Sequence, residues 1–411
     1  MAKSKNANLH RAKSGKNDEF YTQFNDIQNE LKHYKEHFKD KVVLCNCDDP
    51  KQSNFFKYFA YNFYLLGLKE LITTCYKNAS GEEFSALNKP GLFDGEACSL
   101  SLSLSRCAEK SCYLIYKGVD ENGKELRDGD KIDEFIARLK PNLLNHDKNY
   151  PAGDFRSLEC MELLKKADIV VTNPPFSLFR EYVAQLVEYN KKFLIIGNMN
   201  ALTYKEIFRL VKDNQIWLGI SITSGDRKFN VPDSYPLNAA TCGIEKVEKN
   251  GVMVEQKFVR VKGVRWFTNL QHKKRNEILE TIYDYDPQKY PKYDNYDAIN
   301  VDKTIEIPLD YKGAIGVPIT FLDKYNPSQF NIIALGIIGS IDFSCNKKME
   351  ILDKNGLPTG KFTFNAKGTL YRKFDPQLDK KPAFKDCETG ELYSSIYARI
   401  LIKNKIPRGK I

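Results

Sequence analysis

The sequence predicts an α/β protein with a doubly wound, mostly parallel sheet. Short, continuously apolar runs, such as VVLC at 42–45 and FLIIG at 193–197, are typical of strands buried on both faces of a parallel sheet. These runs alternate along the chain with segments whose apolar residues recur at helical spacing. Such alternation indicates strands joined by crossover helices.

The first half of the chain supplies four of these elements. Helical spacing over residues 27–38 precedes a strand at 41–47, a helix at 53–67 and a strand at 70–76. A polar, glycine-containing insertion follows at about 79–150. We expect this insertion to lie on the surface, and the sequence assigns it no role.

The alternation resumes after the insertion. The sequence predicts strands at 167–173, 192–198, 216–220 and 264–270 and helices at 177–190 and 203–213, with a second insertion at about 221–260. Beyond residue 273 the pattern gives way to a segment rich in Tyr, Pro and Asn, YDPQKYPKYDNYDAIN. We therefore expect a second, more irregular domain there.

Charge is concentrated at the two ends of the chain. The net charge is +10, and residues 1–17 and 399–411 each carry five Lys or Arg and no Asp or Glu. Basic ends favour a polyanionic partner, although they also serve solubility alone. No apolar run is long enough to cross a bilayer and no signal peptide is recognisable, so we expect a soluble, cytoplasmic protein.

The ten cysteines match neither a disulfide framework nor a zinc site. The nearest spacing is Cys45-x-Cys47 within an apolar run. We expect free, mostly buried thiols and no bound metal.

Polar turns follow three of the predicted strands or precede their helices. They are Asp48-Asp49-Pro50, the GDF of 153–155 and Asn173-Pro174-Pro175-Phe176. In doubly wound sheets, ligands bind beyond the carboxyl ends of the strands. The sequence therefore predicts the functional site at these turns.

The Asn-Pro-Pro-Phe turn suits chemistry on the exocyclic amine of a nucleobase. Such an amine is a poor nucleophile because its lone pair is delocalised into the ring. The Asn173 side-chain oxygen and the Pro174 carbonyl could accept its hydrogens and favour a pyramidal nitrogen, while Phe176 offers a stacking face for an extruded base. The alternative is a strand ended by prolines, with an ordinary core Phe.

These turns, with DEFYTQ at 18–23 and WFTNL at 266–270, resemble the motif order of adenine-N6 DNA methyltransferases. The blocks NLHRAKSGKNDEFYTQ, CNCDDP, DIVVTNPPFSLF, YPKYDNYDAINV and GVPITFL are similar to the EcoRI-type modification methylases in particular. The resemblance covers nearly the whole chain and is weakest at 79–150 and about 221–260. It implies a seven-stranded Rossmann-like methyltransferase sheet and S-adenosylmethionine as the cofactor.

The resemblance also implies roles for particular residues. The predicted catalytic residues are Asn173, Pro174, Pro175 and Phe176; the predicted cofactor-binding residues are Phe20, Tyr21 and Thr22 at the methionine end, Asp154 and Phe155 at the adenine, and Asp48 and Asp49. The predicted DNA-binding residues are Arg11, Lys13, Lys16, Trp266 and Asn269. No metal ligands are implied.

The sequence departs from the wider methyltransferase pattern at two places. The usual glycine-rich loop after the first strand is replaced by CNCDDP, although EcoRI-type enzymes show the same replacement. The acid that usually binds the cofactor ribose after the second strand is missing from TTCYKN, and no substitute is identified.

Three domains follow from this interpretation. They are a basic arm at 1–17, a catalytic domain at 18–272 and a target-recognition region at 273–411. The implied partners are double-stranded DNA and a restriction endonuclease that cuts the same site, with no direct complex required. We expect a monomer that does not associate with membranes.

Several alternatives stay open at this stage. RNA and protein-glutamine methyltransferases use the same kind of turn, and a non-enzymatic DNA-binding module represents a different class. A 5-cytosine methyltransferase is disfavoured because the chain has no Pro-Cys dipeptide to supply the nucleophile. The HYKEH at 33–37 has the histidine and glutamate spacing of a zinc protease, but its lysine neighbours oppose a dication.

Overall fold

The computed structural model describes residues 21–76, 111–231, 235, 237, 240–249, 252–396 and 398–405. The chain divides into two units, one formed by residues 1–201 with 218–271 and the other by residues 202–217 with 272–411.

The first unit is built on an eight-stranded mixed sheet. Its strand order is β4(Asn142–Leu143), β3(Cys112–Tyr116), β2(Glu70–Cys75), β1(Val42–Cys45), β5(Ile169–Thr172), β6(Lys192–Asn198), β11(Val264–Thr268) and β7(Trp217–Leu218). Strands β2, β1, β5 and β6 are parallel, whereas β3, β4 and β11 pair antiparallel with their neighbours. The α/β class is confirmed, but the described sheet has eight strands where seven were predicted.

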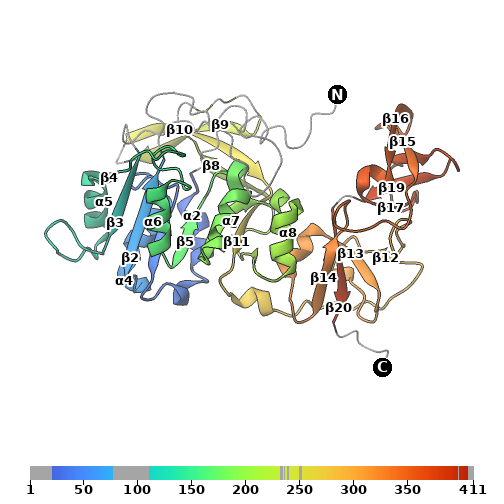
Figure 1. Cartoon of the computed structure of the whole chain (residues 1–411), viewed down its shortest axis with the longest axis horizontal. Helices are drawn as coiled ribbons and strands as arrows, with labels where there is room; N and C mark the ends of the chain where they lie inside the picture. The colour runs from blue at the N-terminus through green and yellow to red at the C-terminus, as the bar shows by residue number, and fades with distance from the viewer. Residues whose placement is uncertain are drawn as a thin grey trace. The chain divides into compact units, whose positions relative to one another are not determined.

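Helices cover both faces of this sheet, as a doubly wound fold requires. One face packs against α2(Phe24–Leu31), α3(Asn54–Tyr61) and α5(Gly129–Arg138), through a core that includes Leu31, Phe56 and Ile136. The other face contacts α6(Leu158–Lys166) and α7(Phe179–Glu188), which Figure 1 shows side by side over the sheet. Between α3 and β2 lies the short α4(Phe63–Leu66).

Local sequence explains where several of these helices begin. The Ser53 hydroxyl accepts from the backbone amides of Phe55 and Phe56, and Ser157 caps α6 in the same way through Cys160. Asp128 accepts from the amide of Asp130 at the start of α5. Each side chain satisfies a helical N–H that would otherwise lack a partner.

The predicted insertions contain regular structure. Residues 111–150 supply β3, α5 and β4, and the second insertion forms a three-stranded antiparallel sheet of β8(Asp226–Asn230), β10(Val252–Lys262) and β9(Cys242–Lys249). This small sheet is drawn above the carboxyl edge of the large sheet in Figure 1.

The second unit is richer in strands than the irregular domain that the sequence predicted. It contains α8(Lys205–Lys212) and two sheets. One has the order β12(Ala298–Asn300), β13(Ala314–Pro318), β20(Arg399–Asn404), β14(Phe330–Leu335); the other has the order β16(Pro358–Phe364), β15(Lys348–Leu352), β18(Phe384–Asp386), β19(Leu392–Ile396), β17(Leu370–Lys373), with the short helical turn α9(Asn365–Gly368) between β16 and β17.

Short 3-10 turns complete the described elements. They are η1(Lys35–His37), η2(Phe176–Leu178), η3(Met199–Thr203), η4(Lys273–Asn276), η5(Thr304–Glu306) and η6(Ile319–Lys324). Because α2 ends at Leu31 and η1 begins at Lys35, the two histidines of HYKEH do not share one α-helical face. No helix among the described residues is long and apolar enough to span a membrane.

Candidate functional site

Asp48 connects the carboxyl ends of three neighbouring strands. Its backbone amide donates to the carbonyl of Thr74 at 2.8 Å, and the Thr73 hydroxyl donates to its carbonyl at 2.5 Å. These bonds tie it to β2. The Thr172 hydroxyl, at the end of β5, lies 2.7 Å from its carboxyl Oδ2. The turn after β1 is therefore held against both of its parallel neighbours.

The Asp48 carboxyl is buried among hydroxyl groups. Its Oδ1 accepts from the Ser53 hydroxyl at 2.9 Å, and the Ser53 oxygen in turn caps α3. Burial raises the pKa of the Asp48 carboxyl to about 7, with the nearby charge of Asp49 adding to the rise and the bonds from Thr172 and Ser53 opposing it. Near neutral pH this group therefore has both a protonated and an ionised form available.

The turn that replaces the glycine-rich loop is stabilised without glycine. Cys47 takes the left-handed conformation, with φ of 61°, that glycine usually supplies. Asp49 is 5% exposed, and its Oδ1 accepts from the amide of Lys51 at 2.9 Å, while its carbonyl accepts from the amide of Ser53 at 2.7 Å. Asp48 and Asp49 thus both shape the turn that leads into α3.

Tyr21 and Thr22 lie beside this turn and beside β8. Tyr21 exchanges two backbone hydrogen bonds with Asn230, and the carbonyl of Thr22 accepts from the Asn54 side chain at 2.7 Å. The Thr22 hydroxyl is buried and has no hydrogen-bond partner within the described part of the chain. Phe20, predicted to act with them, falls outside the described residues.

Asp154 is 3% exposed and forms an ion pair with a residue that the sequence reasoning missed. Its Oδ1 accepts from the amide and Nε of Arg156, and its Oδ2 accepts from a terminal guanidinium nitrogen at 2.8 Å. Burial alone would lower the pKa of Arg156, but the bonds and charge of Asp154 raise it above its ordinary value. Arg156 is visible in the sequence GDFR at 153–156, but nothing in the sequence indicates that its side chain pairs with Asp154.

Aromatic rings surround this ion pair. The Arg156 guanidinium carbon lies 4.7 Å from the ring centroid of Tyr150 and 5.2 Å from that of Phe155. Phe155 is 3% exposed and packs edge-to-face on Tyr182 of α7, with 5.0 Å between ring centroids. Phe155 is therefore fixed in place by its neighbours.

The Asn173–Phe176 turn leads directly from β5 into η2 and α7. Pro174 and Phe176 are buried, and Asn173 and Pro175 are partly exposed. The Phe176 ring packs edge-to-face on Phe229 of β8, with 6.4 Å between centroids at an angle of 87°. This contact places β8 next to the turn and leaves Phe176 8% exposed.

The structure does not support the DNA contacts predicted for Trp266 and Asn269. Trp266 is 1% exposed in the middle of β11 and packs edge-to-face on Phe55. Asn269 bonds to the backbone of Phe193 and Lys191 at the amino-terminal end of β6, which is the edge opposite the predicted site. Both residues therefore hold the sheet together. Arg11, Lys13 and Lys16 fall outside the described residues.

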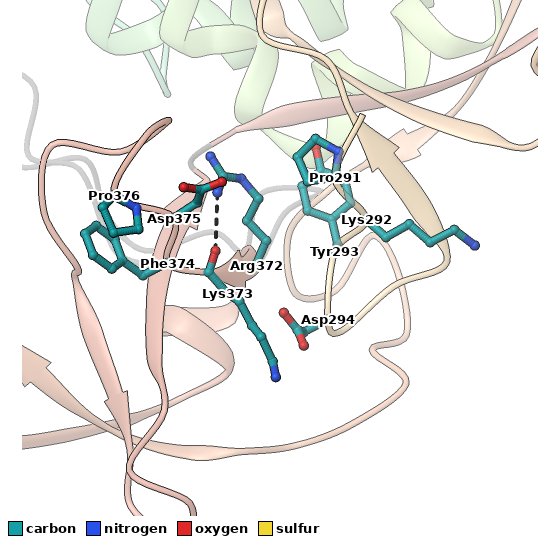
Figure 2. Close-up of a pocket in the computed structure, with 9 residues that line it drawn as sticks. All are labelled: Pro291, Lys292, Tyr293, Asp294, Arg372, Lys373, Phe374, Asp375 and Pro376. Atoms are coloured by element: carbon teal, nitrogen blue, oxygen red, sulfur yellow. Dashed lines mark hydrogen bonds between the residues drawn. The ribbon is translucent and has the colours of Figure 1, made fainter. Parts of the chain in front are cut away.

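A separate pocket of about 560 Å³ lies in the second unit, between residues 291–294 and 372–376. Figure 2 shows the Arg372 side chain between Pro291 and Asp375. Arg372 is 3% exposed and is held by Asp379 through two bonds of 2.8 and 2.9 Å, while its Nε has no hydrogen-bond partner among the described residues. The pocket contains none of the predicted catalytic or cofactor-binding residues.

The described residues contain no group of three or more His, Cys, Asp or Glu side chains arranged to hold a metal ion. The eight described cysteines form no disulfide with one another, and four of them are buried.

Comparisons with known proteins agree on one family. The family model described as adenine-specific methyltransferase EcoRI matches residues 8–405. The chain is 47% identical over 354 residues to the Type II methyltransferase M.EcoRI of Escherichia coli, which spans 84% of this chain and 96% of that protein. It is 39% identical over 327 residues to the Type II methyltransferase M.MpnI of Mycoplasma pneumoniae, spanning 79% and 84% of the two chains. No solved structure gives a significant match.

Proposed function

Because the chain belongs to the EcoRI family of adenine-specific methyltransferases, we propose that the carboxyl edge of its large sheet is where a methyl group passes to the N6 amine of adenine in DNA. The protein is a Type II adenine-specific DNA methyltransferase of a restriction-modification system. The observation that carries the site assignment is the Asn173–Phe176 turn, which leaves β5 at Thr172, where that residue's hydroxyl meets Asp48.

The turn would activate the amine by accepting its hydrogens. The Asn173 side-chain oxygen and the Pro174 carbonyl are two acceptors on one short segment, and the prolines limit how that segment can move. Hydrogen bonds that strengthen as the nitrogen becomes pyramidal lower the barrier to methyl transfer without a general base. The two prolines also remove backbone N–H donors that would compete for the acceptors.

Phe176 and Pro175 would hold the target base after it leaves the duplex. The base must be extruded because its amine is not accessible to this edge of the sheet while it is stacked in DNA. Phe176 is braced by Phe229, so it offers a fixed contact to a base that approaches from the partly exposed side of the turn.

S-adenosylmethionine is the methyl donor that we assign to the neighbouring part of the edge. When bound, it supplies the methyl group from a sulfonium. The buried Thr22 hydroxyl, with no partner in the described residues, fits a polar group at the methionine end. Asp48 and Asp49 would lie beside it, and Tyr21 and Phe20 would complete this end.

Asp154 would bind the adenine of the donor through its remaining acceptor. A carboxylate offers about four lone-pair positions, and three hydrogen bonds from Arg156 engage this one. One position on Oδ2 is left for an exocyclic amine, and Phe155 lies next to it in the chain. The ion pair thus orients Asp154 without saturating it.

The rest of the chain would position the duplex. Arg11, Lys13 and Lys16 supply phosphate contacts that carry no sequence information. The second unit, which includes residues 273–411, would contain the target-recognition surface. A monomer can perform this reaction, and a cognate endonuclease would share the DNA site without binding the enzyme.

Transfer of a labelled methyl group tests this assignment. Purified chain would be incubated with labelled S-adenosylmethionine and, separately, with duplex DNA, RNA and a glutamine-bearing protein, and the product nucleoside would be identified. We expect N6-methyladenine in the duplex alone. Label in RNA or in protein glutamine would instead support the other chemistries that share this turn.

A further inference from the structure

One face of the five-stranded sheet of the second unit packs in a hydrophobic core. Directly opposed residues of antiparallel strands share a face, and the register pairs Met349 with Thr363, Ile351 with Phe384, and Phe384 with Tyr393. Met349, Phe384 and Tyr393 are buried in one cluster with Ala366 and Tyr371. The apolar side chains of this inner face are therefore buried by other residues of the same unit.

The opposite face is covered at only one end. At the β17 end, Leu370 and Ile396 pair across the strands and are buried in a cluster that includes Tyr293 and Leu401. At the β16 end, the register brings Phe364 opposite Lys348, Phe362 opposite Glu350, Glu350 opposite Lys385, and Lys385 opposite Leu392. We call the residues Lys348, Glu350, Phe362, Phe364, Lys385 and Leu392 the outer face.

The outer face gathers exposed apolar side chains. Phe362 and Phe364 are each 55% exposed, and Leu392 is 39% exposed. Single exposed apolar residues are ordinary, but several on one face of a sheet mark an interaction surface.

Cations accompany these rings. The Lys348 ammonium lies 5.0 Å from the ring centroid of Phe362, and Lys385 is exposed on the same face. The outer face holds two lysines and one acid, Glu350, whose carboxylate accepts from the amide of Gly360 at 3.0 Å. Lys347 does not add to this face, because its ammonium bonds to the hydroxyl of Tyr393 at 2.6 Å. The outer face therefore has an excess of positive charge beside its aromatic rings.

The β15–β16 hairpin is ordered although β16 has little packing. Six of the seven residues of β16 are exposed, and the seventh, Thr363, is partly buried. Its turn is fixed by Asp353, whose carboxylate accepts from the amides of Asn355 and Leu357 at 2.8 and 2.9 Å. The hairpin thus presents side chains to solvent on a defined backbone.

We propose that the outer face is a DNA-contacting surface of the enzyme, with Lys348 and Lys385 directed to phosphates and Phe362 and Phe364 to sugars and thymine methyl groups. The inference rests on DNA being the substrate. The major groove of B-DNA admits a two-stranded β-ribbon, and apolar side chains there contact the thymine methyl. Positive charge interleaved with aromatic rings matches a duplex better than it matches an apolar protein surface.

Two double variants test the proposal in the full-length protein. Phe362→Ala with Phe364→Ala removes the rings, and Lys348→Gln with Lys385→Gln removes the charges. The control is Ile278→Ala with Ile282→Ala, which truncates two exposed apolar residues of the same unit that are 68% and 80% exposed. All three change exposed side chains, so thermal unfolding is expected to match the wild type and serves as the check on folding.

We expect the aromatic variant to raise the Kd for duplex DNA about tenfold, which corresponds to about 1.4 kcal/mol. The lysine variant should reduce the slope of log affinity against log salt by about 1.8, at ~0.9 per phosphate for two lysines. Methyl transfer at saturating DNA should stay within about twofold of the wild type in both, and the isoleucine control should bind DNA normally.

Unchanged affinity and salt slope in both variants, with a wild type that binds and methylates DNA, would overturn the outer face as a DNA surface and leave the proposed function intact. Equal weakening by the isoleucine control would also overturn it, because the effect would then not belong to this face. A wild type that neither binds nor methylates DNA would overturn the proposed function and this surface together.

Discussion

Replacing Asp48 with asparagine should make the first unit more stable at alkaline pH. The reason is the number of protons available at the carboxyl edge. The Thr172 hydroxyl has one hydrogen and lies within hydrogen-bonding distance of both the Asn46 carbonyl and Asp48 Oδ2. When the Asp48 carboxyl is ionised, this single hydrogen can reach only one of the two oxygens. When the carboxyl is protonated, it can donate its own hydrogen to the Thr172 oxygen, and the Thr172 hydroxyl can then donate to the Asn46 carbonyl. An asparagine amide would donate in the same place, and its oxygen would still accept from Ser53.

The size of the effect follows from the pKa of Asp48. Burial raises this pKa from 3.8 to about 7, and each pKa unit corresponds to about 1.4 kcal/mol. Ionising the group in the folded chain therefore costs up to about 4 kcal/mol. Because the folded pKa is raised, the stabilisation is fully present below pH 3.8 and is lost as the pH rises through about 7. The asparagine variant has no such loss.

The measurement is denaturant unfolding at a series of pH values. A Trp217→Phe background leaves Trp266, which is 1% exposed in the large sheet, as the single reporter. The stability of Asp48→Asn relative to this background should rise between pH 4 and pH 7 and level off above that. Asp342→Asn, an exposed site in the other unit, controls for the loss of one carboxylate. If the difference in the free energy of unfolding between Asp48→Asn and its background does not depend on pH, Asp48 is ionised throughout. That result would refute the inference that the folded chain holds a proton on Asp48.

Three further predictions concern the chemistry and the duplex. Asn173→Ala should nearly abolish methyl transfer while leaving cofactor and DNA binding within a few-fold, since its hydrogen bond strengthens only in the transition state; wild-type turnover would exclude the mechanism. Asp154→Ala, made in an Arg156→Gln background so that no guanidinium is left unpaired, should raise the Kd for S-adenosylmethionine about tenfold over Arg156→Gln alone; an unchanged titration would remove Asp154 from the site. Deleting residues 1–17 should lower the salt slope of DNA binding by about 2.7, if three of the five cations contact phosphates, on target and scrambled duplexes alike; an unchanged slope would reduce the arm to a solubility tail.

The parallel strands could be predicted from the sequence because their signal is local. Strand β6 was expected at 192–198 and occupies Lys192–Asn198, and β1, β2 and β5 fall within their predicted segments. A strand buried on both faces must be apolar throughout, so it needs no information from its neighbours to be recognised. The turns at the carboxyl ends followed from the same strands.

The antiparallel sheets could not be predicted in this way. Strand β16 (PTGKFTF) contains Pro, Gly, Thr and Lys and is exposed over nearly its whole length, and β9 (CGIEKVEK) is rich in Glu and Lys, so the composition of both resembles that of a loop. Their existence depends on pairing with distant segments, for example β13 with β20, 80 or more residues along the chain. Register of this kind is set by tertiary contacts that a single sequence does not display.

The DNA contacts predicted for Trp266 and Asn269 share one origin. Both were assigned from a motif that follows the Asn173–Phe176 turn in sequence, whereas the structure buries Trp266 in the core and bonds the Asn269 side chain to the backbone at the start of β6. A motif match identifies residues that resemble those of a family. It does not show whether each residue packs within the sheet or contacts the substrate.

Partners already present in the fold decide what a side chain can still bind. Asp48 and Asp154 are both acids at the carboxyl edge, and the sequence treats them alike. Asp48 meets hydroxyl groups from Ser53 and Thr172, and its raised pKa of about 7 makes both a protonated and an ionised form available near neutral pH. Asp154 is bound by Arg156 through three hydrogen bonds and has one acceptor position left. A cofactor amine can therefore bond to the open acceptor position of Asp154, whereas a cationic group beside Asp48 gains a charge partner only after the Asp48 carboxyl has lost its proton. Donor binding to this enzyme should accordingly strengthen as the pH rises through about 7, and it should lose that dependence in Asp48→Asn.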